Sequence, residues 1–485
     1  MKEILANCTD DETRVAIVED GHLTDFFVER LGEQNVVGNI YKGKVASVLD
    51  GIQAAFVDIG VSKSGYLSFS ELTIDKRELP KTKFLLVQVT KSPLGTKGSK
   101  LTQQISLPGH YLVYIPSSLR TGVSKNIIDE KERFRLKSII EEIKPPTGGF
   151  IVRSEGAGKE KDVFKREIKY LVKLWETINK KFDSASSVSL LHRDLGIVFK
   201  TVRDYLNEQI SVVFIDSKEE YEDTLNFVEM ISPKFKDKIH FYKNKTPIFE
   251  TSQALICSGG THQDAKGGPS NIEQQIVNIQ KQKIKLPSGG YIIIQEAETL
   301  CAIDVNSGKF VTADSQDEII LRTNLEALYE IAAQLRLRNI GGIIVIDLID
   351  MRHSADRKKV FNLLCELVKK DKAKTEILPV TKLGLIEMTR QRKTESMVNF
   401  LSQTCPYCEG SGQVLSKETM AIKIKKEILK LVTRGGEQPV RLIVYPDIAE
   451  LFDEEYTKKI ENKINRKIVV EANSQVHRED YRIIL

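Results

Sequence analysis

Short apolar segments separated by glycine run through the first part of the chain and predict β-strands. Within residues 37–115, VVGNIYKGKVASVLDGIQAAFVDIG is followed by SGYLSFSEL and FLLVQVTKSP, each of them rich in strand-forming residues. Many short strands with glycine-containing turns at close intervals are typical of small barrels. We therefore expect a small β-barrel over about 37–115.

Later segments carry apolar residues at helical spacing. Residues 131–143 and 164–182 follow this pattern, and so does 417–432 (KETMAIKIKKEILKLV), which precedes the strand-like RLIVYP. Residues 210–249 alternate strand-like and helical pieces, whereas 251–270 are small, polar and glycine-rich and predict a loop. An α/β region follows that loop.

Residues 289–351 hold the most informative pattern. GGYIIIQEAETLCAIDVNSGKF predicts two strands joined by a tight turn at Glu296–Glu298. Ser315 and Glu318 then form a capping box at the start of an amphipathic helix. Two glycines end that helix, and IIVIDLIDM predicts a buried strand.

Two carboxylates stand near the ends of these apolar strands, Asp304 in the first and Asp347 in the second. A charged group in an apolar strand is costly unless it is paired or binds a metal. If the strands are neighbours, both carboxylates reach the sheet edge where α/β proteins usually place ligands. Asn306 projects from the same face as Asp304. Two carboxylates and an amide, with positions left for water and phosphate, suit Mg²⁺ and phosphoryl chemistry.

A purely structural interpretation competes with the metal site. Asp304 and Asp347 could be strand-end residues that cap nearby amides, and for either one alone this interpretation is favoured. Together with Asn306 and the basic stretch TRQRK (389–393), they favour the metal.

The stretch TCPYCEGSG places Cys405 and Cys408 at zinc-ligand spacing, but a closed zinc site needs four ligands. Cys365 lies among leucines and is expected in a core. Cys257 and His262 are rival ligands in a loop, and their spacing is weak evidence. The simplest completion is the same turn from a second copy of the chain.

Composition sets the class of protein. The chain has 485 residues, which suggests roughly three domains, and its net charge of +5 excludes neither nucleic acid nor a metabolite. Its first residues, MKEILANCTDDETR, contain no targeting signal, and no apolar run approaches the ~18 residues of a membrane span. Six scattered cysteines fit a reducing compartment. We expect a cytoplasmic protein without a membrane span.

AIDVNSGKF, NLEALYEIAAQLRLRNIGGIIVIDLIDM, LPSGGYIIIQ and TCPYCEGSG resemble motifs of the ribonuclease E/G family, and the resemblance covers nearly the whole chain. It implies an Mg²⁺-dependent endoribonuclease that cuts single-stranded RNA and leaves a 5′-phosphate. The metal-binding aspartates of the family match Asp304 and Asp347, and its asparagine near the scissile phosphate matches Asn306. Asp350 lies in the same motif, and we expect it to support the site.

The resemblance also assigns residues that hold RNA. Two base-contacting phenylalanines of the family's OB-fold module match Phe56 and Tyr66, and lysines of the same segment supply charge. Aromatic faces stack bases and lysines follow the backbone. From the residues alone, Phe56 would be core. The lysines expected to contribute are Lys42, Lys44 and Lys97.

A second RNA contact is implied within GGFIVRSEGAGKE (148–160). The family's Arg-Thr pair that senses the 5′-monophosphate matches Arg153 and Ser154. A strand, small residues and a helix in succession can hold an anion. From the residues alone, the segment would be a basic turn.

The implied fold class is multidomain α/β and α+β. It comprises an RNase H-like subdomain split in sequence, an OB-fold barrel, a 5′-sensor region, a DNase I-like catalytic domain, a zinc-link and a small C-terminal domain. The implied bounds are, in that order, 1–36 with 211–271, 37–118, 119–210, 272–400, 401–414 and 415–485. Residues 251–270 form an insertion within the first of these. The long disordered scaffold of the E-type members is missing, so the chain looks closer to the G type.

The expected assembly is a homodimer or homotetramer in which Cys405 and Cys408 share one Zn²⁺ with a second subunit. The expected roles are maturation of rRNA and tRNA and decay of mRNA. Two other classes compete. One is a catalytically inactive RNA-binding protein, against which Asp304, Asn306 and Asp347 argue together. The other is a phosphatase or phosphodiesterase with no RNA preference, against which the barrel argues.

Overall fold

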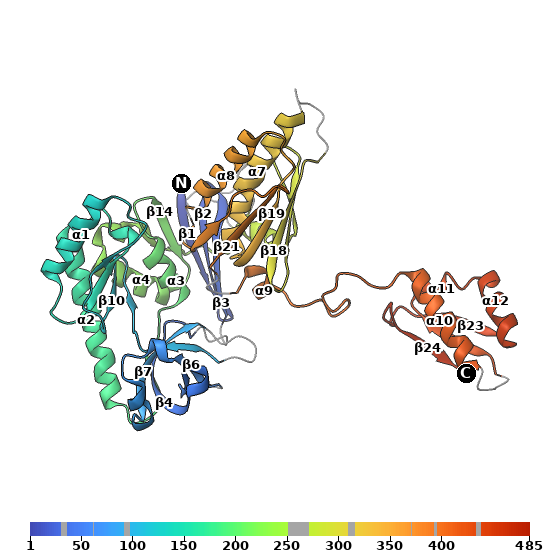
Figure 1. The fold of residues 1–485 in the computed structure, drawn as a ribbon, viewed down its shortest axis with the longest axis horizontal. Coiled ribbons are helices and arrows are strands. Elements are labelled where there is room, and N and C mark those ends of the chain that lie inside the picture. The colour runs from blue at the N-terminus through green and yellow to red at the C-terminus, as the bar shows by residue number, and fades with distance from the viewer. Residues whose placement is uncertain are drawn as a thin grey trace. The chain divides into compact units, whose positions relative to one another are not determined.

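A computed structural model describes most of the chain, in two compact units, Met1–Val398 and Asn399–Leu485 (Figure 1). The described residues are 1–30, 36–61, 63–91, 98–250, 271–308, 316–369, 371–391, 395–432 and 438–485. Four residues that were singled out above, Lys97, Cys257, His262 and Ser315, lie outside these ranges.

The first sheet joins segments that are far apart in sequence. Its strand order is β15-β14-β1-β2-β3, in which β1 runs parallel to β14 and antiparallel to β2. Helices α3, α4 and α6 pack around it. The bounds are β1 Lys2–Cys8, β2 Glu12–Glu19, β3 His22–Arg30, β14 Ile210–Ile215, β15 Ile239–Phe241, α3 Ile197–Tyr205, α4 Lys218–Ile231 and α6 Ile272–Asn278.

The predicted small barrel is confirmed as a closed set of five strands that is consistent with an OB-like fold. The strands follow each other in the order β4-β5-β6-β8-β7, and β7 pairs back onto β4. A further strand, β13, extends the sheet beside β4. The bounds are β4 Ile40–Leu49, β5 Ala54–Asp58, β6 Gly65–Ser68, β7 Phe84–Lys91, β8 Lys100–Thr102 and β13 Ser189–His192.

A four-stranded sheet, β11-β12-β10-β9, packs against two helices that the sequence predicted. Helix α1 spans Glu130–Ile143 and α2 spans Lys161–Ser184, so the helices expected over 131–143 and 164–182 are confirmed. The strands are β9 Leu107–Pro108, β10 Leu112–Ile115, β11 Gly122–Val123 and β12 Gly149–Val152.

The third large sheet has six strands in the order β16-β17-β18-β19-β21-β20. Helices α7 and α8 cover one of its faces, because their apolar residues share one core with the buried positions of the strands. The bounds are β16 Lys283–Lys285, β17 Tyr291–Glu296, β18 Leu300–Asn306, β19 Gly342–Asp347, β20 Thr375–Ile377, β21 Leu385–Arg390, α7 Gln316–Leu337, α8 Ser354–Val368 and α9 Met397–Leu401.

The second unit is built on a three-stranded sheet, β23-β22-β24. Helix α10 spans Lys417–Val432, as the sequence predicted, and packs on the sheet through Met420, Ile424 and Ile428. The other elements are β22 Val440–Val444, β23 Ile468–Ala472, β24 Tyr481–Ile484, α11 Pro446–Ala449 and α12 Glu454–Ile464. Among the described residues, no helix is both long and apolar enough to cross a membrane.

Candidate active site

Asp304 and Asp347 are direct neighbours on two parallel strands. Strands β18 and β19 pair in a register that sets Asp304 opposite Asp347 at the last residue of β19. Neighbouring strands lie roughly 4.8 Å apart, so the two carboxylates extend from adjacent backbone positions. Both residues are exposed. The condition on which the sequence argument depended, that the two strands are neighbours, is therefore met.

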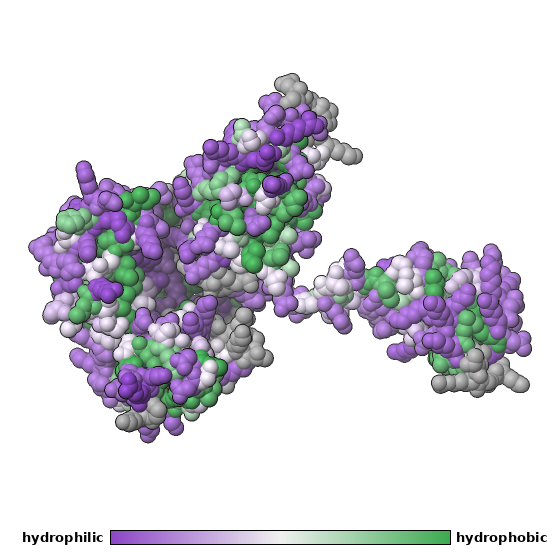
Figure 2. Space-filling model, viewed as in Figure 1, coloured by the Kyte–Doolittle hydropathy of each residue, from purple (hydrophilic) through white to green (hydrophobic). Residues whose placement is uncertain are grey.

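Alternation along the strands explains why the carboxylates face solvent. In β18, Cys301, Ile303 and Val305 point into the core under α7 and α8, and the residues between them point to the opposite face. Strand β19 follows the same rule, with its core positions at Ile344 and Ile346. The resulting open face combines acidic residues with exposed apolar ones, and Figure 2 shows apolar residues gathered over β18 and β19.

Asn306 extends the site along the same strand. Its Nδ2 donates a hydrogen bond to Oδ2 of Asp304 over 2.7 Å. The backbone at Gly290 packs closely against Asn306. A Cβ at Gly290 would lie 2.7 Å from the main-chain oxygen of Asn306, so this position needs a glycine. The three residues predicted from the sequence thus meet at one edge of the sheet.

The donor set fits a hard divalent cation. Two exposed carboxylates lie side by side, and in the part of the chain that the structure describes neither of them forms an ion pair with a basic residue. Mg²⁺ prefers such oxygen ligands and retains several waters. The described residues contain no cluster of three or more acidic, histidine or cysteine side chains that could hold a metal. Asp350 was expected to support the site. Its supporting role stays a prediction.

Asn324, which the sequence analysis did not single out, fixes the segment after β19. This residue of α7 is fully buried; its Nδ2 donates to the main-chain oxygen of Ile349 over 2.8 Å, and its Oδ1 accepts from the Ile349 amide over 3.0 Å. The two bonds hold the backbone between Asp347 and Asp350. An asparagine on an otherwise apolar helix face was the available signal.

Arg153 and Ser154 lie together at the end of β12, as the sequence placed them. Nη1 of Arg153 donates to the main-chain oxygen of Gly109 over 2.6 Å and to Oδ1 of Asp204 over 2.9 Å. The hydroxyls of Ser154 and Ser124 lie 3.2 Å apart. Burial opposes ionisation of Asp204, but the guanidinium groups of Arg203 and Arg153 more than offset it and hold the pKa of Asp204 at about 2.

Ser124 belongs to a loop that a second arginine organises. Arg133, from α1, donates through Nη1 to the main-chain oxygens of Ser124 and Ile127, and through Nη2 to that of Val123. Neither the loop nor Arg133 was among the predicted site residues. Arg133 holds Ser124, and Ser124 in turn lies against Ser154, which is 30 positions away in the sequence.

Phe56 and Tyr66 stand opposite each other on β5 and β6, with ring centroids 6.1 Å apart in an edge-to-face arrangement. Both are half-buried and lie outside the barrel core, which contains Ala55, Val57 and Leu67. The core interpretation of Phe56 is therefore wrong. Lys100 on β8 lies beside Tyr66 in register and adds charge that the sequence analysis missed.

Lys42 does not contribute to this surface, although it was expected to supply charge for RNA. It is almost fully buried, and its Nζ donates to the main-chain oxygens of Phe182 and Ala185 at the end of α2. A lysine at this position satisfies carbonyls that the helix leaves without partners. Lys42 therefore has a structural role, whereas Lys44 is exposed.

Comparisons with known proteins agree with the motifs. A model of the Ribonuclease E/G family matches residues 106–255 and 264–393. Over its whole length the chain is 34% identical to ribonuclease G of Escherichia coli (strain K12) and 33% identical to ribonuclease G of Haemophilus influenzae, and it covers 99% of each. It is 32% identical to ribonuclease E of Escherichia coli (strain K12), of which it covers 46%.

The chain belongs to the ribonuclease E/G family. The family inferred from the motifs is thereby confirmed. A second model, described as the thioredoxin-like domain of RNase E/G, matches residues 404–484. That likeness was not predicted from the sequence. The matched range contains Cys405 and Cys408, the last two cysteines of the sequence.

The cysteine turn of this family member has the hydrogen bonds that favour thiolates. Main-chain amides of Cys408 and Tyr407 point at the Cys405 sulfur and, together with the Cys408 thiol, lower the pKa of Cys405. The Gly412 amide donates to Sγ of Cys408 over 3.3 Å. Thiolates are the form that binds zinc, so the turn fits half of a four-cysteine site.

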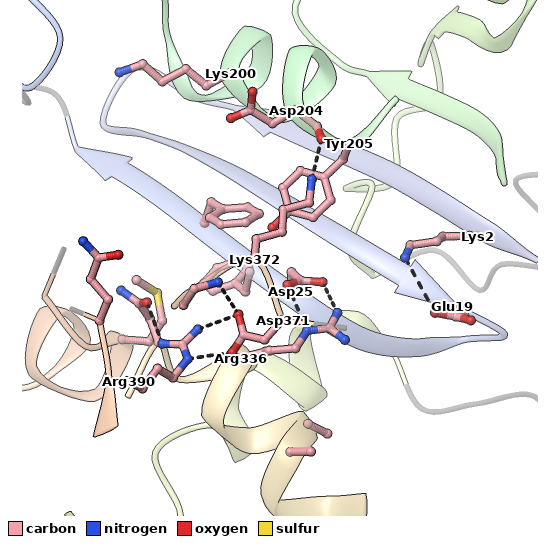
Figure 3. A pocket seen from close by; sticks show the side chains of 18 of the residues that line it. Lys2, Glu19, Asp25, Lys200, Asp204, Tyr205, Arg336, Asp371, Lys372 and Arg390 are labelled. Carbon is pink, nitrogen blue, oxygen red and sulfur yellow. Dashed lines mark hydrogen bonds and ion pairs between the residues drawn. The ribbon is translucent and has the colours of Figure 1, made fainter. Parts of the chain in front are cut away.

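A cavity of about 1140 Å³ in the first unit lies away from the carboxylates. It is lined by the first sheet, the end of α3 and the segment that precedes β20 (Figure 3). Arg390 also lines the cavity, and it pairs with Gly342 at the start of β19. Asp347 is the last residue of the same strand, so the cavity and the carboxylates lie toward opposite ends of β19. Charges in the cavity are largely paired within it, as in Arg336 with Asp25 and Arg390 with Asp371.

Proposed function

We propose that this member of the ribonuclease E/G family is an endoribonuclease that hydrolyses single-stranded RNA at Asp304 and Asp347 and leaves 5′-phosphate ends. The register that sets Asp304 beside Asp347 carries the proposal, because it gives the open sheet face two adjacent carboxylates without basic partners among the described residues. The ribonuclease names of its full-length relatives support the same activity.

Asp304 and Asp347 would hold a catalytic Mg²⁺, which when bound lowers the pKa of water and neutralises charge on a phosphoryl group. Asn306 keeps the Asp304 carboxylate in place through its 2.7 Å hydrogen bond and directs the rest of its amide to the scissile phosphate. In the overall reaction, the oxygen of water bonds to phosphorus and the bond from phosphorus to the 3′ oxygen breaks. The products are a 5′-phosphate and a 3′-hydroxyl.

The barrel and the region of β12 would hold the substrate. Phe56 and Tyr66 present half-exposed rings outside the barrel core, which suits stacking of unpaired bases. Lys97 lies outside the described residues and stays a predicted RNA contact. Arg153 and Ser154 would bind a 5′-monophosphate, and the guanidinium is held for that purpose by Gly109 and Asp204.

The cysteine turn supports an oligomeric enzyme. Cys405 and Cys408 supply two thiols, and a second copy of the turn would complete a structural Zn²⁺ site in a homodimer or homotetramer. We assign the first sheet to the RNase H-like subdomain and the six-stranded sheet to the DNase I-like domain, with the bounds expected from the sequence. A cytoplasmic role in rRNA and tRNA maturation and mRNA decay belongs to the same proposal.

A short single-stranded RNA tests the activity. The wild-type protein with Mg²⁺ should cut it internally, and Asp304→Ala should abolish cutting while still binding the RNA. Tight binding without cleavage by the wild type would instead favour a catalytically inactive RNA-binding protein. Cleavage that persists in Asp304→Ala would remove the proposed site.

A further inference from the structure

A basic and aromatic strip lies next to the carboxylates on the open face of the six-stranded sheet. It consists of Lys283 and Lys285 on the edge strand β16 and Tyr291 on β17, and we call it the Tyr291 strip. Tyr291 is half-buried, and both lysines are exposed.

Strand register connects the strip to the site. In one row across the sheet, Lys283 pairs with Ile293, Ile293 with Asp304 and Asp304 with Asp347. In the next row, Lys285 pairs with Tyr291 and Tyr291 with Asn306. Paired residues project from the same face, so Tyr291 stands one strand, roughly 5 Å, from the asparagine assigned to the scissile phosphate.

The two lysines of the strip carry positive charge that no carboxylate among the described residues neutralises. Nζ of Lys283 lies 3.6 Å from the centroid of the Tyr291 ring. Neither Lys283 nor Lys285 forms an ion pair with a carboxylate within the ranges that the structure describes. Lys283 is two strands from Asp304, about 10 Å along the sheet, so it does not compensate that carboxylate directly.

We propose that the Tyr291 strip binds the nucleotide next to the scissile phosphate, with its base on the Tyr291 ring and its phosphate at Lys283 and Lys285. The inference rests on the proposed nuclease site at Asp304 and Asp347. A polyanion that approaches two carboxylates needs nearby positive charge, and the strip supplies it on the side of Asn306. The flexible lysine stem lets the Lys283 ammonium move from the ring to a phosphate.

Stacking on one tyrosine tolerates any base, because every base has a π-face. The strip therefore increases the affinity for the flanking nucleotide without selecting its sequence. The chemistry also separates the two parts of the strip, since the ring recognises the base and the lysines recognise the backbone. Each part has its own experimental signature.

An abasic substrate tests the ring. Two RNAs would be compared, one complete and one lacking the base at the nucleotide next to the cleavage site, on either side in turn. Tyr291→Ala should lower kcat/KM on the complete RNA by roughly 5- to 150-fold and leave kcat/KM on one of the abasic RNAs unchanged. Tyr291→Phe keeps the ring and should behave as the wild type on both.

Salt dependence tests the lysines. Lys283→Gln should reduce the slope of log kcat/KM against log salt by about 0.7, the value for one phosphate contact on a single strand. Lys374→Gln, at the opposite edge of the same sheet, and Tyr329→Ala, on α7, are matched controls that should change neither slope nor abasic response.

The outcomes separate this inference from the proposed function. A Tyr291→Ala loss that is equal on complete and abasic RNAs, or no loss at all, would overturn the strip while Asp304-dependent cleavage still supports the nuclease. Cleavage that does not depend on Asp304 would overturn the nuclease site whatever Tyr291 does.

Discussion

The Asp204 carboxylate accepts a hydrogen bond from the Arg153 guanidinium over 2.9 Å, although the two residues are 51 positions apart. Asp204 also pairs with Arg203 over 2.9 Å, so it keeps a cationic partner when Arg153 turns to another anion. The main-chain oxygen of Asp204 accepts from Nζ of Lys372, which precedes β20 in the catalytic sheet. Asp204 thus contacts both the predicted 5′-end site and the catalytic region.

Replacing Arg153 by glutamine should remove the response to the 5′ end. The wild-type protein is expected to cut a 5′-monophosphorylated RNA faster than the same RNA with a 5′-hydroxyl, because the charged guanidinium binds the phosphate. Arg153→Gln should bring the two rates together and leave the 5′-hydroxyl rate within about twofold of wild type. Equal wild-type rates on both RNAs would contradict the sensor and leave the nuclease site intact.

Asp204 should make stability depend on acidic pH. Its pKa in the folded protein is about 2, below the ordinary value of 3.8, so its ionised form stabilises the fold above pH 3.8. The difference between these two pKa values corresponds to about 2 kcal/mol of folding stability. This stabilisation should be lost as the pH falls from 3.8 through 2. The melting temperature of Asp204→Asn should lie below that of wild type at pH 6.

The same pair of proteins provides the check on sign. The difference in melting temperature between wild type and Asp204→Asn should narrow progressively below about pH 4, since protonation removes the charge in the wild type as well. A difference that stays constant from about pH 6 to pH 3 would show that the ionised carboxylate is not the stabilising form.

Asn324→Leu should weaken the catalytic region through the segment after β19. The substitution removes both hydrogen bonds to Ile349 and leaves its partly buried amide and carbonyl without these partners, at a cost of up to about 1–3 kcal/mol each. We expect a lower melting temperature and a reduced kcat with little change in RNA affinity. The control is Arg322→Gln on the same helix, which loosens an exposed ion pair with Glu326 and should leave kcat unchanged.

Zinc removal should dissociate the oligomer. If Cys405 and Cys408 supply half of a shared site, the metal content should be one zinc for every two chains, and Cys408→Ser should lower the measured mass of the assembly. Sedimentation with and without a chelator would measure the mass of the assembly in each state. One zinc in every single chain would place the remaining ligands within the same subunit.

The sequence predicted those features that depend on local pattern. The helix at Lys417–Val432 and the small barrel followed from periodicity and the spacing of short strands. Asp304 and Asn306 share a strand face because side chains alternate along any strand. Such features need no knowledge of distant contacts.

Features that depend on distant contacts were missed or misjudged. Lys42 was expected to bind RNA, but the carbonyls that it satisfies come from residues 140 and 143 positions away. The partnership of Arg153 with Asp204 and the pairing of β18 with β19 are likewise set by tertiary packing. Composition and spacing carry no signal for them.

The most direct test of the Asp304–Asp347 site is a double-mutant cycle on cleavage in Mg²⁺. Asp304→Asn and Asp347→Asn keep the side-chain shape and remove one charge each, and single-turnover rates would be measured for both and for the double variant over a range of Mg²⁺ concentrations. If the pair holds one ion, each single change should abolish most of the rate, and the double variant should be scarcely slower than either. Independent, multiplicative losses, or an unchanged Mg²⁺ requirement in either variant, would contradict the shared site.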